Sequence, residues 1–222
     1  MRFSDLREAG RALASKLDAY GEAEDVAVVG IAHGGVPVAA EVAKRLGATL
    51  DVLLIRRLLA PHGPNSLLCA VNVCGHLVLD EQLPPYAAVP ETPFDYFIAD
   101  ALEELARQER VCRDGRSALN LAQKTILLVD NGVRTGLTVR AAIRALRVLV
   151  PARVVVAVPV AAPESRSFVE SLADELLCLA WPEPFGHVGM FYADFTRPDE
   201  EQIRETLNQA RKAGAGGRRR PE

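Results

Sequence analysis

ILLVDNGVRTGLTVRAAIRALR, residues 126–147, indicates the class of fold. A hydrophobic run ends at Asp130, and turn-forming residues follow as far as Gly136. Apolar residues then recur at helical spacing. We therefore expect a buried strand over residues 125–130, a turn that can hold a ligand, and a helix over residues 137–146.

The same order of strand, turn and helix repeats on both sides of this stretch. The further predicted strands are residues 25–31, 51–55, 153–160 and 175–180, and the further predicted helices are residues 6–20, 36–46, one opening at Pro163 and one over residues 198–212. This alternation predicts an α/β fold with an open, mostly parallel sheet flanked by helices. Ligands of such sheets bind beyond the carboxyl ends of the strands. The turns to inspect are AHGG (residues 32–35), RRLLAP (56–61), DNGVRTG (130–136) and WPEPFG (181–186).

The middle of the chain departs from this alternation. LLCAVNVCGHLVL, residues 67–79, is β-rich and predicts a hairpin or an irregular excursion from the sheet over about residues 67–80. A Pro-rich loop is expected over residues 84–93, and a helix rich in Glu and Arg over residues 94–111. We expect one domain over residues 1–212 and a disordered Gly- and Arg-rich tail over residues 213–222.

Composition and charge argue against several classes of protein. The 222 residues carry a net charge of −3, which gives no reason to expect nucleic acid or an anionic membrane as a partner. No apolar stretch approaches the roughly 20 residues that span a bilayer, and the N-terminus lacks the apolar core of a signal peptide. The four cysteines are scattered, which predicts reduced thiols and a cytoplasmic location.

The turn after the central predicted strand offers contacts for a phosphate and for a sugar. Gly132 and Gly136 permit close approach of the backbone, and the N–H groups at a helix start favour an anion. Thr135 and Thr138 add hydroxyl donors, with Thr138 the expected cap of the helix. Asp130 can accept hydrogen bonds from sugar hydroxyls or face Mg²⁺. The alternative is a tight turn with no ligand, because such turns favour the same residue types.

These residues resemble a known family. ILLVDNGVRTGLTVRAAIRALR is similar to the phosphoribosyl diphosphate (PRPP) binding motif of the type I phosphoribosyltransferases. VGIAHGGVPVAAEVAKRLGATLDVLLIRRLLAP, AVPVAAPES and PEPFGHVGMFYADF resemble segments of an uncharacterised branch of predicted phosphoribosyltransferases. The resemblance extends over residues 26–207.

The resemblance implies a core parallel sheet with a small hood subdomain, built from N-terminal and C-terminal segments, over the strand ends. It implies transfer of ribose 5-phosphate from PRPP to a nitrogenous base or similar acceptor, with release of pyrophosphate and with Mg²⁺ as cofactor. The expected ligand is thus a small phosphorylated sugar or nucleotide. The oligomeric state stays open, although the resembled fold often pairs and the excursion is a candidate homodimer interface.

The resemblance also implies a role for each matching position. Asp130 and Asn131 would face the ribose hydroxyls, with Asp130 also near Mg²⁺. The 5-phosphate cradle would comprise Gly132, Val133, Arg134, Thr135, Gly136 and Thr138. Pyrophosphate would lie against Ala32, His33, Gly34 and Gly35, with Arg56 or Arg57 neutralising it and Arg110 or Arg113 reaching it from a lid. Trp181 and Phe185 would stack on the acceptor.

Three polar positions depart from the resembled pattern. Asn131 occupies the second acidic position, His33 occupies the place of a usual Arg, and PNSLLC (residues 64–69) carries Asn65 and Cys69 where Glu and Gly are usual. An amide and an imidazole bind Mg²⁺ and diphosphate less strongly than a carboxylate and a guanidinium. A catalytically weakened, regulatory module that binds PRPP or a nucleotide is therefore the main alternative to a transferase.

Several smaller signals have more ordinary interpretations. A hydrolase of phosphorylated sugars is disfavoured because no pair of base and nucleophile stands out. Cys69, Cys74 and His76 match no standard zinc spacing, and Cys112 lacks an adjacent base. Trp181 and Phe185 could equally be hood core, and the Glu and Arg residues of the helix over residues 94–111 could form a solvated face.

Overall fold

The computed structural model describes residues 1–21, 25–59, 67–72, 77–79 and 91–217. Its main sheet has five strands in the order β2-β1-β6-β7-β8, and every neighbouring pair runs parallel. The strands are β1 (Val26–Ile31), β2 (Thr49–Leu53), β6 (Thr125–Val129), β7 (Arg153–Val160) and β8 (Glu175–Ala180). The predicted open, mostly parallel sheet is confirmed, and each predicted main-sheet strand is present within two residues of its expected bounds.

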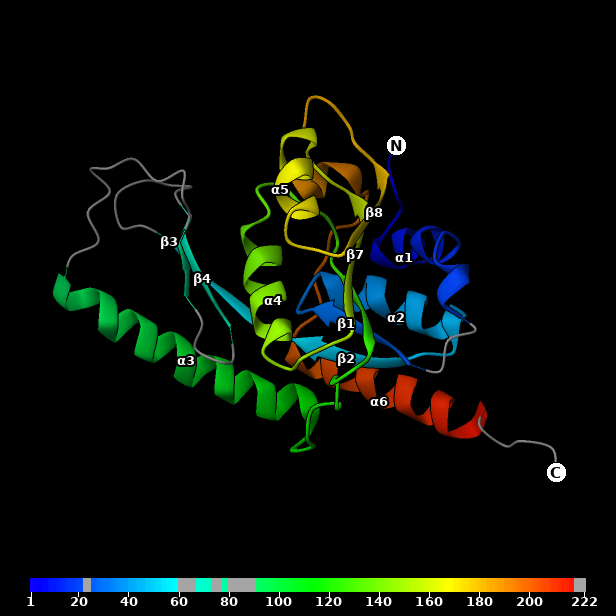
Figure 1. Cartoon of the computed structure of the whole chain (residues 1–222), viewed down its shortest axis with the longest axis horizontal. Coiled ribbons are helices and arrows are strands. Elements are labelled where there is room, and N and C mark those ends of the chain that lie inside the picture. The colour runs from blue at the N-terminus through cyan, green and yellow to red at the C-terminus, as the bar shows by residue number, and fades with distance from the viewer. Residues whose placement is uncertain (22–24, 60–66, 73–76, 80–90, 218–222) are drawn as a thin grey trace.

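Helices cover both faces of this sheet (Figure 1). α1 (Leu6–Ala14), α2 (Gly35–Leu46) and α6 (Glu200–Gly217) pack on one face, whereas α4 (Leu137–Arg147) and α5 (Arg166–Glu170) pack on the other. Successive strand residues point to opposite faces, so Leu127 joins the first core and Leu128 the second. Burial on both faces explains why the strands are almost continuously apolar.

A second, three-stranded sheet follows β2. It has the antiparallel order β3-β4-β5, formed by β3 (Ile55–Leu59), β4 (Leu67–Asn72) and β5 (Leu77–Leu79). The predicted hairpin is therefore confirmed, with β3 as an additional partner. α3 (Glu91–Arg113) comes next and begins inside the predicted loop, most of whose residues lie outside the described ranges. In Figure 1 this sheet and the start of α3 stand away from the main sheet.

The two terminal helices differ from their predicted lengths. α1 ends at Ala14 and a short 3-10 helix (Asp18–Tyr20) follows, although Leu17 is fully buried. The apolar spacing thus continues past the end of the helix. Such spacing indicates which side chains are buried, but it does not show where the helical backbone hydrogen bonds stop. α6 continues to Gly217, so residues 213–217 of the predicted disordered tail are helical. The sequence prediction assigned these glycines to the disordered tail, and the rest of the tail lies outside the described residues.

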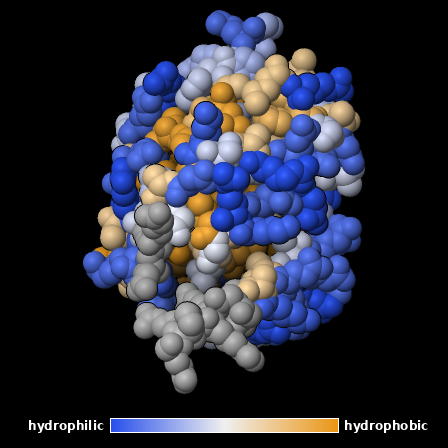
Figure 2. All heavy atoms as spheres, turned by 90° about the vertical axis from the view of Figure 1, so that its right-hand side faces the viewer, coloured by the Kyte–Doolittle hydropathy of each residue, from blue (hydrophilic) through white to orange (hydrophobic). Residues whose placement is uncertain are grey.

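Two further 3-10 helices, Pro163–Ser165 and Val188–Phe191, flank β8. The helix predicted to open at Pro163 begins with the first of these and continues as α5. Seen from the right-hand side of Figure 1, the surface is mainly hydrophilic with smaller hydrophobic patches (Figure 2). Within the described ranges, no helix combines the length and the apolar character needed to cross a bilayer.

Candidate active site

β1 and β6 lie at the point where the order of the main sheet changes direction. The chain leaves β1 for β2 on one side, whereas β6 leads to β7 and β8 on the other. Ligands of open α/β sheets bind beyond the carboxyl ends of such a strand pair. The loops that begin there are residues 32–35 after β1 and residues 130–136 after β6. The fold therefore brings together two of the four turns that the sequence singled out.

Two glycines allow these loops to touch. A Cβ atom at Gly34 would overlap the side-chain amide of Asn131, and one at Gly35 would lie 2.6 Å from the carbonyl oxygen of Val129. The side chain of Asn131 is in turn buried, with 7% of the residue exposed. The Asn131 side chain thus lies at the contact between the two loops. Its contact with ribose stays a prediction.

The loop after β6 leads into the N-terminus of α4. Gly136 is the N-cap with a φ of 84°, and among the described residues no side chain caps the helix. The prediction that Thr138 caps it is wrong, because Thr138 is the second residue inside the helix. The first N–H groups of α4 remain without a side-chain cap, an arrangement that favours an anion. Arg134 and Thr135 are exposed beside them.

Asp130 supplies the carboxylate of the site. Its Oδ1 accepts a hydrogen bond from the backbone N–H of Asn131 at 2.7 Å. Burial raises the pKa of Asp130 to about 7, against the opposing effects of this hydrogen bond and of the Arg197 and Arg57 guanidiniums. The carboxyl group is therefore divided between its protonated and ionised forms near neutral pH.

β3 directs its two arginines differently. Arg56 lies 4.0 Å from Asp100 of α3. Arg57 instead acts electrostatically on Asp130, as alternation of side chains along a strand allows. Of the two candidates for neutralising pyrophosphate, Arg57 is the one whose charge acts on Asp130.

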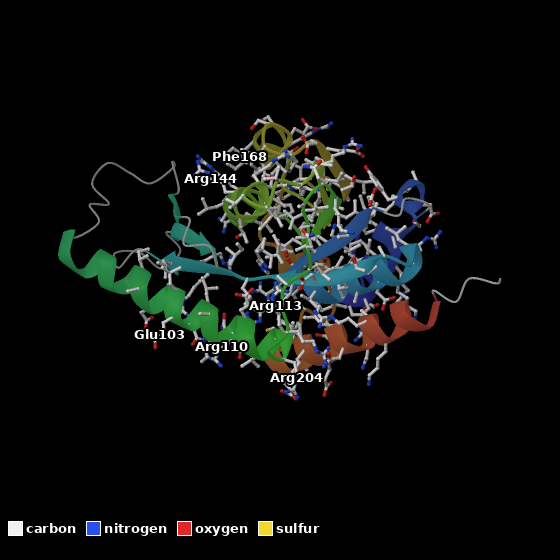
Figure 3. The ribbon with its side chains drawn as sticks, turned by 60° about the horizontal axis from the view of Figure 1, so that its bottom comes forward. Glu103, Arg110, Arg113, Arg144, Phe168 and Arg204 are labelled. Carbon is white, nitrogen blue, oxygen red and sulfur yellow. The ribbon has the colours of Figure 1, made fainter. Side chains whose placement is uncertain are left out.

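The arginines near the end of α3 are not brought to these loops. Arg113 is buried, forms an ion pair with Asp51 of β2, and donates a hydrogen bond of 2.8 Å to the carbonyl oxygen of Val52. Asp51 also accepts a hydrogen bond from the Leu119 N–H at 2.8 Å. Arg110 is exposed on the outer side of α3 (Figure 3). Arg113 thus ties α3 to the main sheet, which leaves its guanidinium engaged with Asp51. Contact of Arg110 with pyrophosphate stays a prediction.

His33 connects the loop after β1 to the C-terminal part of the chain. Its backbone has a positive φ of 32°, and its Nδ1 lies 3.3 Å from the carbonyl oxygen of Pro198. Because a carbonyl can only accept, this hydrogen bond requires a proton on Nδ1. His33 is therefore held by the hood segment, defined here as residues 181–198.

The hood segment is anchored to the loop after β6 as well. The hydroxyl group of Tyr192 donates a 2.6 Å hydrogen bond to the carbonyl oxygen of Asn131. The backbone of residues 191–194 also exchanges hydrogen bonds with Phe3 and Ser4 near the N-terminus. These contacts hold the segment over the strand ends from both sides.

The two aromatic residues expected to stack on an acceptor lie in different packing environments. Trp181 packs beside the α4 and α5 core, with the Arg166 guanidinium 5.3 Å from its ring centroid. Phe185 packs on the α1 and α2 core, 5.0 Å from the ring of Phe191. Both rings thus take part in packing, as the alternative interpretation expected, and stacking on an acceptor stays a prediction.

The described cysteines and acidic residues offer no other reactive centre. Burial raises the pKa of both the Cys112 and the Cys178 thiol to about 11, which keeps them protonated at neutral pH. Within the described ranges, no group of three or more His, Cys, Asp or Glu side chains could hold a metal ion. The side chains of Cys69, Cys74 and His76 lie outside the residues whose side chains are described.

Comparison with known proteins identifies the family. The sequence model of the phosphoribosyl transferase domain matches residues 4–193. The chain belongs to this family. Its switch-point loops are therefore those of a phosphoribosyltransferase domain, and the predicted resemblance is confirmed.

Three relatives are similar over most of the chain. Two Mycobacterium tuberculosis proteins, from strains CDC 1551 / Oshkosh and ATCC 25618 / H37Rv, are provisionally named phosphoribosyl transferases and are each 37% identical over 213 residues. The match covers 94% of this chain but 47% of each relative, so the chain spans about half the length of these relatives. The crystal structure of a Thermus thermophilus protein is 38% identical with a TM-score of 0.76, covering 94% of this chain and 99% of that one.

Two residues of the candidate site were not predicted as ligand-binding or anchoring residues. Neither Tyr192 nor Arg197 is among the positions to which the resemblance assigned a role. Both lie in the hood segment, where the sequence has no strand or helix period that would indicate direction. The pattern around them, FYADFTR (residues 191–197), is rich in aromatic residues and indicates burial. It does not show which part of the sheet this segment covers.

Proposed function

We propose that this domain binds PRPP and transfers ribose 5-phosphate from it to a base-like acceptor, releasing pyrophosphate. The observation that supports this most is the contact of the loop after β1 with the loop after β6, through Gly34 and Asn131. One loop provides a helix N-terminus without a side-chain cap for a 5-phosphate. The other provides a glycine-rich turn, with Arg57 nearby, for a second anionic group.

Each loop has a distinct part in this proposal. The 5-phosphate lies on residues 132–138, where the N–H groups of α4 and the hydroxyl of Thr135 can donate. Asp130 accepts hydrogen bonds from the ribose hydroxyls. Pyrophosphate lies against residues 32–35, with Arg57 as its nearest cation from β3.

The chemistry of the proposed reaction suits this division. The bond from C1 of ribose to pyrophosphate lengthens before the acceptor nitrogen bonds, so positive charge builds on the sugar and negative charge on the leaving group. Cations and N–H groups around pyrophosphate stabilise that state more than the bound substrate. Most of the protein's contribution is placement of the sugar against the acceptor.

Mg²⁺ fits the site only as an ion that arrives with the ligand. Asp130 is a single carboxylate with a raised pKa and two guanidiniums in its field. Mg²⁺ often keeps several waters and binds through one or two carboxylates together with substrate phosphates. Asp130 would be its protein ligand, and the ion would supply neutralisation of the diphosphate.

A regulatory module that binds PRPP or a nucleotide without turnover is the second candidate. The burial of Asn131 against Gly34 favours it, since the position of a second acidic group is used to join the loops. Partial protonation of Asp130 at neutral pH weakens the remaining carboxylate in the same direction.

Ligand binding and turnover are tested separately. Binding is measured as the rise in melting temperature on adding PRPP with Mg²⁺, and turnover as pyrophosphate released with a panel of nitrogenous bases. Asp130→Ala should abolish the shift caused by PRPP, whereas Asp114→Ala, which removes an exposed carboxylate, should retain it. A shift without pyrophosphate release supports the regulatory module, and no shift with PRPP, nucleotides or pyrophosphate rejects both candidates.

A further inference from the structure

A polar cavity lies on the outer side of the helices α1, α2 and α6, which cover one face of the main sheet (Figure 1). Its volume is about 380 Å³, within the range of pockets that hold small ligands. Its walls come from the start of α1, the first turn of α2, the first half of α6 and the end of the hood segment. Among the described residues that line it, none belongs to residues 32–35 or 130–136. The cavity is therefore separate from the loops of the candidate active site.

Three carboxylates from three different walls line this cavity. Asp5 directly precedes α1, Asp194 lies in the hood segment, and Glu205 lies in α6. Among the described residues, none of these three carboxylates has a cation within ion-pair distance. The one cation among the described lining residues is Arg7, which lies 3.6 Å from Glu41 of α2. The cavity therefore has an excess of negative charge, which favours a cationic ligand.

The carboxylates keep hydrogen-bonding capacity for such a ligand. Asp5 accepts the backbone N–H of Glu8 at 2.7 Å, and Asp194 accepts the backbone N–H of Thr196 at 2.8 Å. A carboxylate can accept about four hydrogen bonds, so both can accept more. Hydrogen bonds from Thr196 lower the pKa of Asp194, which keeps it ionised at neutral pH. The side chain of Glu205 forms no hydrogen bond with another described residue.

The carboxylates are spread around the cavity instead of being gathered at one point. Within the described ranges, no group of three or more His, Cys, Asp or Glu side chains could hold a metal ion, so these three cannot bind one ion together. Leu6, Pro37 and Pro198 add apolar surface from three of the walls. A ligand that matches this lining has positive charges at separate positions and hydrocarbon between them.

We propose that this cavity binds an aliphatic diamine, with an ammonium group at each end of a short hydrocarbon chain. One ammonium group donates to Asp194 and the other to Glu205, so the bound diamine fastens the hood segment to α6. Pro198 lines the cavity and also accepts the contact from Nδ1 of His33 at 3.3 Å, so the fastened end of the hood segment is the end that meets the loop after β1. The inference goes beyond the proposed function and requires no binding of PRPP.

The test compares three small molecules of similar length by calorimetry on the whole chain: 1,4-diaminobutane, butylamine and 1,4-butanediol. The diamine should bind, butylamine should bind at least about fivefold more weakly because it reaches one carboxylate, and the diol should not bind. Asp194→Asn and Glu205→Gln should each weaken the diamine by about fivefold, the upper end of the effect of an exposed ion pair. In hydrogen exchange, the diamine should slow the backbone N–H groups of Asp194 and Thr196.

Glu201→Gln is the matched control. Glu201 is an exposed carboxylate one turn before Glu205 on α6, pairs with Arg204, and is not among the residues that line the cavity. Its removal should change the diamine affinity by less than about twofold. Equal losses with Glu201→Gln and Glu205→Gln would assign binding to general surface charge and overturn the inference. Equal binding of butylamine and the diamine, or no binding of the diamine, also overturns it, whereas failure to bind PRPP would refute only the proposed function.

Discussion

Replacing Asp130 by Asn should stabilise the folded chain, and more at pH 8 than at pH 5. Asp130 has a pKa of about 7 in the folded protein against an ordinary value of 3.8, because burial disfavours the carboxylate. The folded state therefore holds this proton more tightly than the unfolded state. The free energy of unfolding falls as the pH rises from about 4 to about 7 and is then constant with respect to this group.

The size of the effect follows from the two pKa values. At pH 8 their difference, multiplied by 1.36 kcal/mol per pKa unit, gives a penalty of about 4 kcal/mol. At pH 5 only the interval above 3.8 counts, and the penalty is about 1.6 kcal/mol. Asn cannot ionise, and its Oδ1 can still accept the N–H of Asn131. Partial exposure of Asp130 reduces both values, so we expect a difference between the two pH values of at least about 1 kcal/mol.

The assay is denaturant unfolding of the unaltered chain and of Asp130→Asn at both pH values, without ligand. Asp114→Asn makes the same chemical change at an exposed site and controls for the amide itself. A gain of about 1 kcal/mol corresponds to a rise of roughly 2–4 °C in melting temperature for a chain of this size. Equal gains at pH 5 and pH 8, or no gain at pH 8, would refute the assignment of a raised pKa to Asp130.

Three further substitutions test the packing that builds the site. Gly34→Ala should cost about 1–3 kcal/mol, because its Cβ would overlap the amide of Asn131, and Asn131→Ala should remove most of that cost in a double-mutant cycle measured by urea unfolding. Tyr192→Phe removes the 2.6 Å hydrogen bond to the carbonyl oxygen of Asn131 and should lower stability by about 1–2 kcal/mol in the same assay, an unchanged midpoint being the contrary result. Arg113→Met should lower the free energy of unfolding by about 3–5 kcal/mol, because it leaves Asp51 buried without its partner. The double variant Arg113→Met with Asp51→Leu should recover much of this loss in thermal unfolding. A double variant no more stable than the single one would contradict this.

The main sheet was predictable because its signals are local. A strand buried on both faces is an apolar run, and a helix that covers it is amphipathic, so both patterns can be read within about ten residues. Val26–Ile31 and Thr125–Val129 were accordingly expected almost at their observed bounds. Glycines at turns gave a second local signal, and Gly34 and Gly35 do meet the loop after β6. The predicted and observed helix ends differ after Ala14, because the buried apolar residues continue to Leu17 although the backbone is no longer α-helical.

The cations of the site were less predictable because their direction is a tertiary property. An arginine in a sequence shows charge but not where its long side chain ends. Arg113 looked like a candidate for pyrophosphate and is buried with Asp51, 62 residues away in the chain. Arg197 gave no signal and lies in the field of Asp130. Which group an arginine meets depends on the order of the strands in the folded sheet. Arg113 meets Asp51 because α3 passes beside β2, the strand at one edge of the order β2-β1-β6-β7-β8.

The contacts of Asn131 and His33 in the folded chain alter how the departures at these two positions should be judged. Considered residue by residue, an amide and an imidazole in place of two charged groups indicate a weakened site. In the folded chain Asn131 joins the two loops, and His33 lies within hydrogen-bond distance of Pro198 in the hood segment. Both residues thus make structural contacts that do not depend on a charge at their positions. The absence of a charged residue from one loop is therefore insufficient to conclude that turnover is lost. The pyrophosphate that the unaltered chain releases with a panel of nitrogenous bases is the quantity that separates a transferase from a regulatory module.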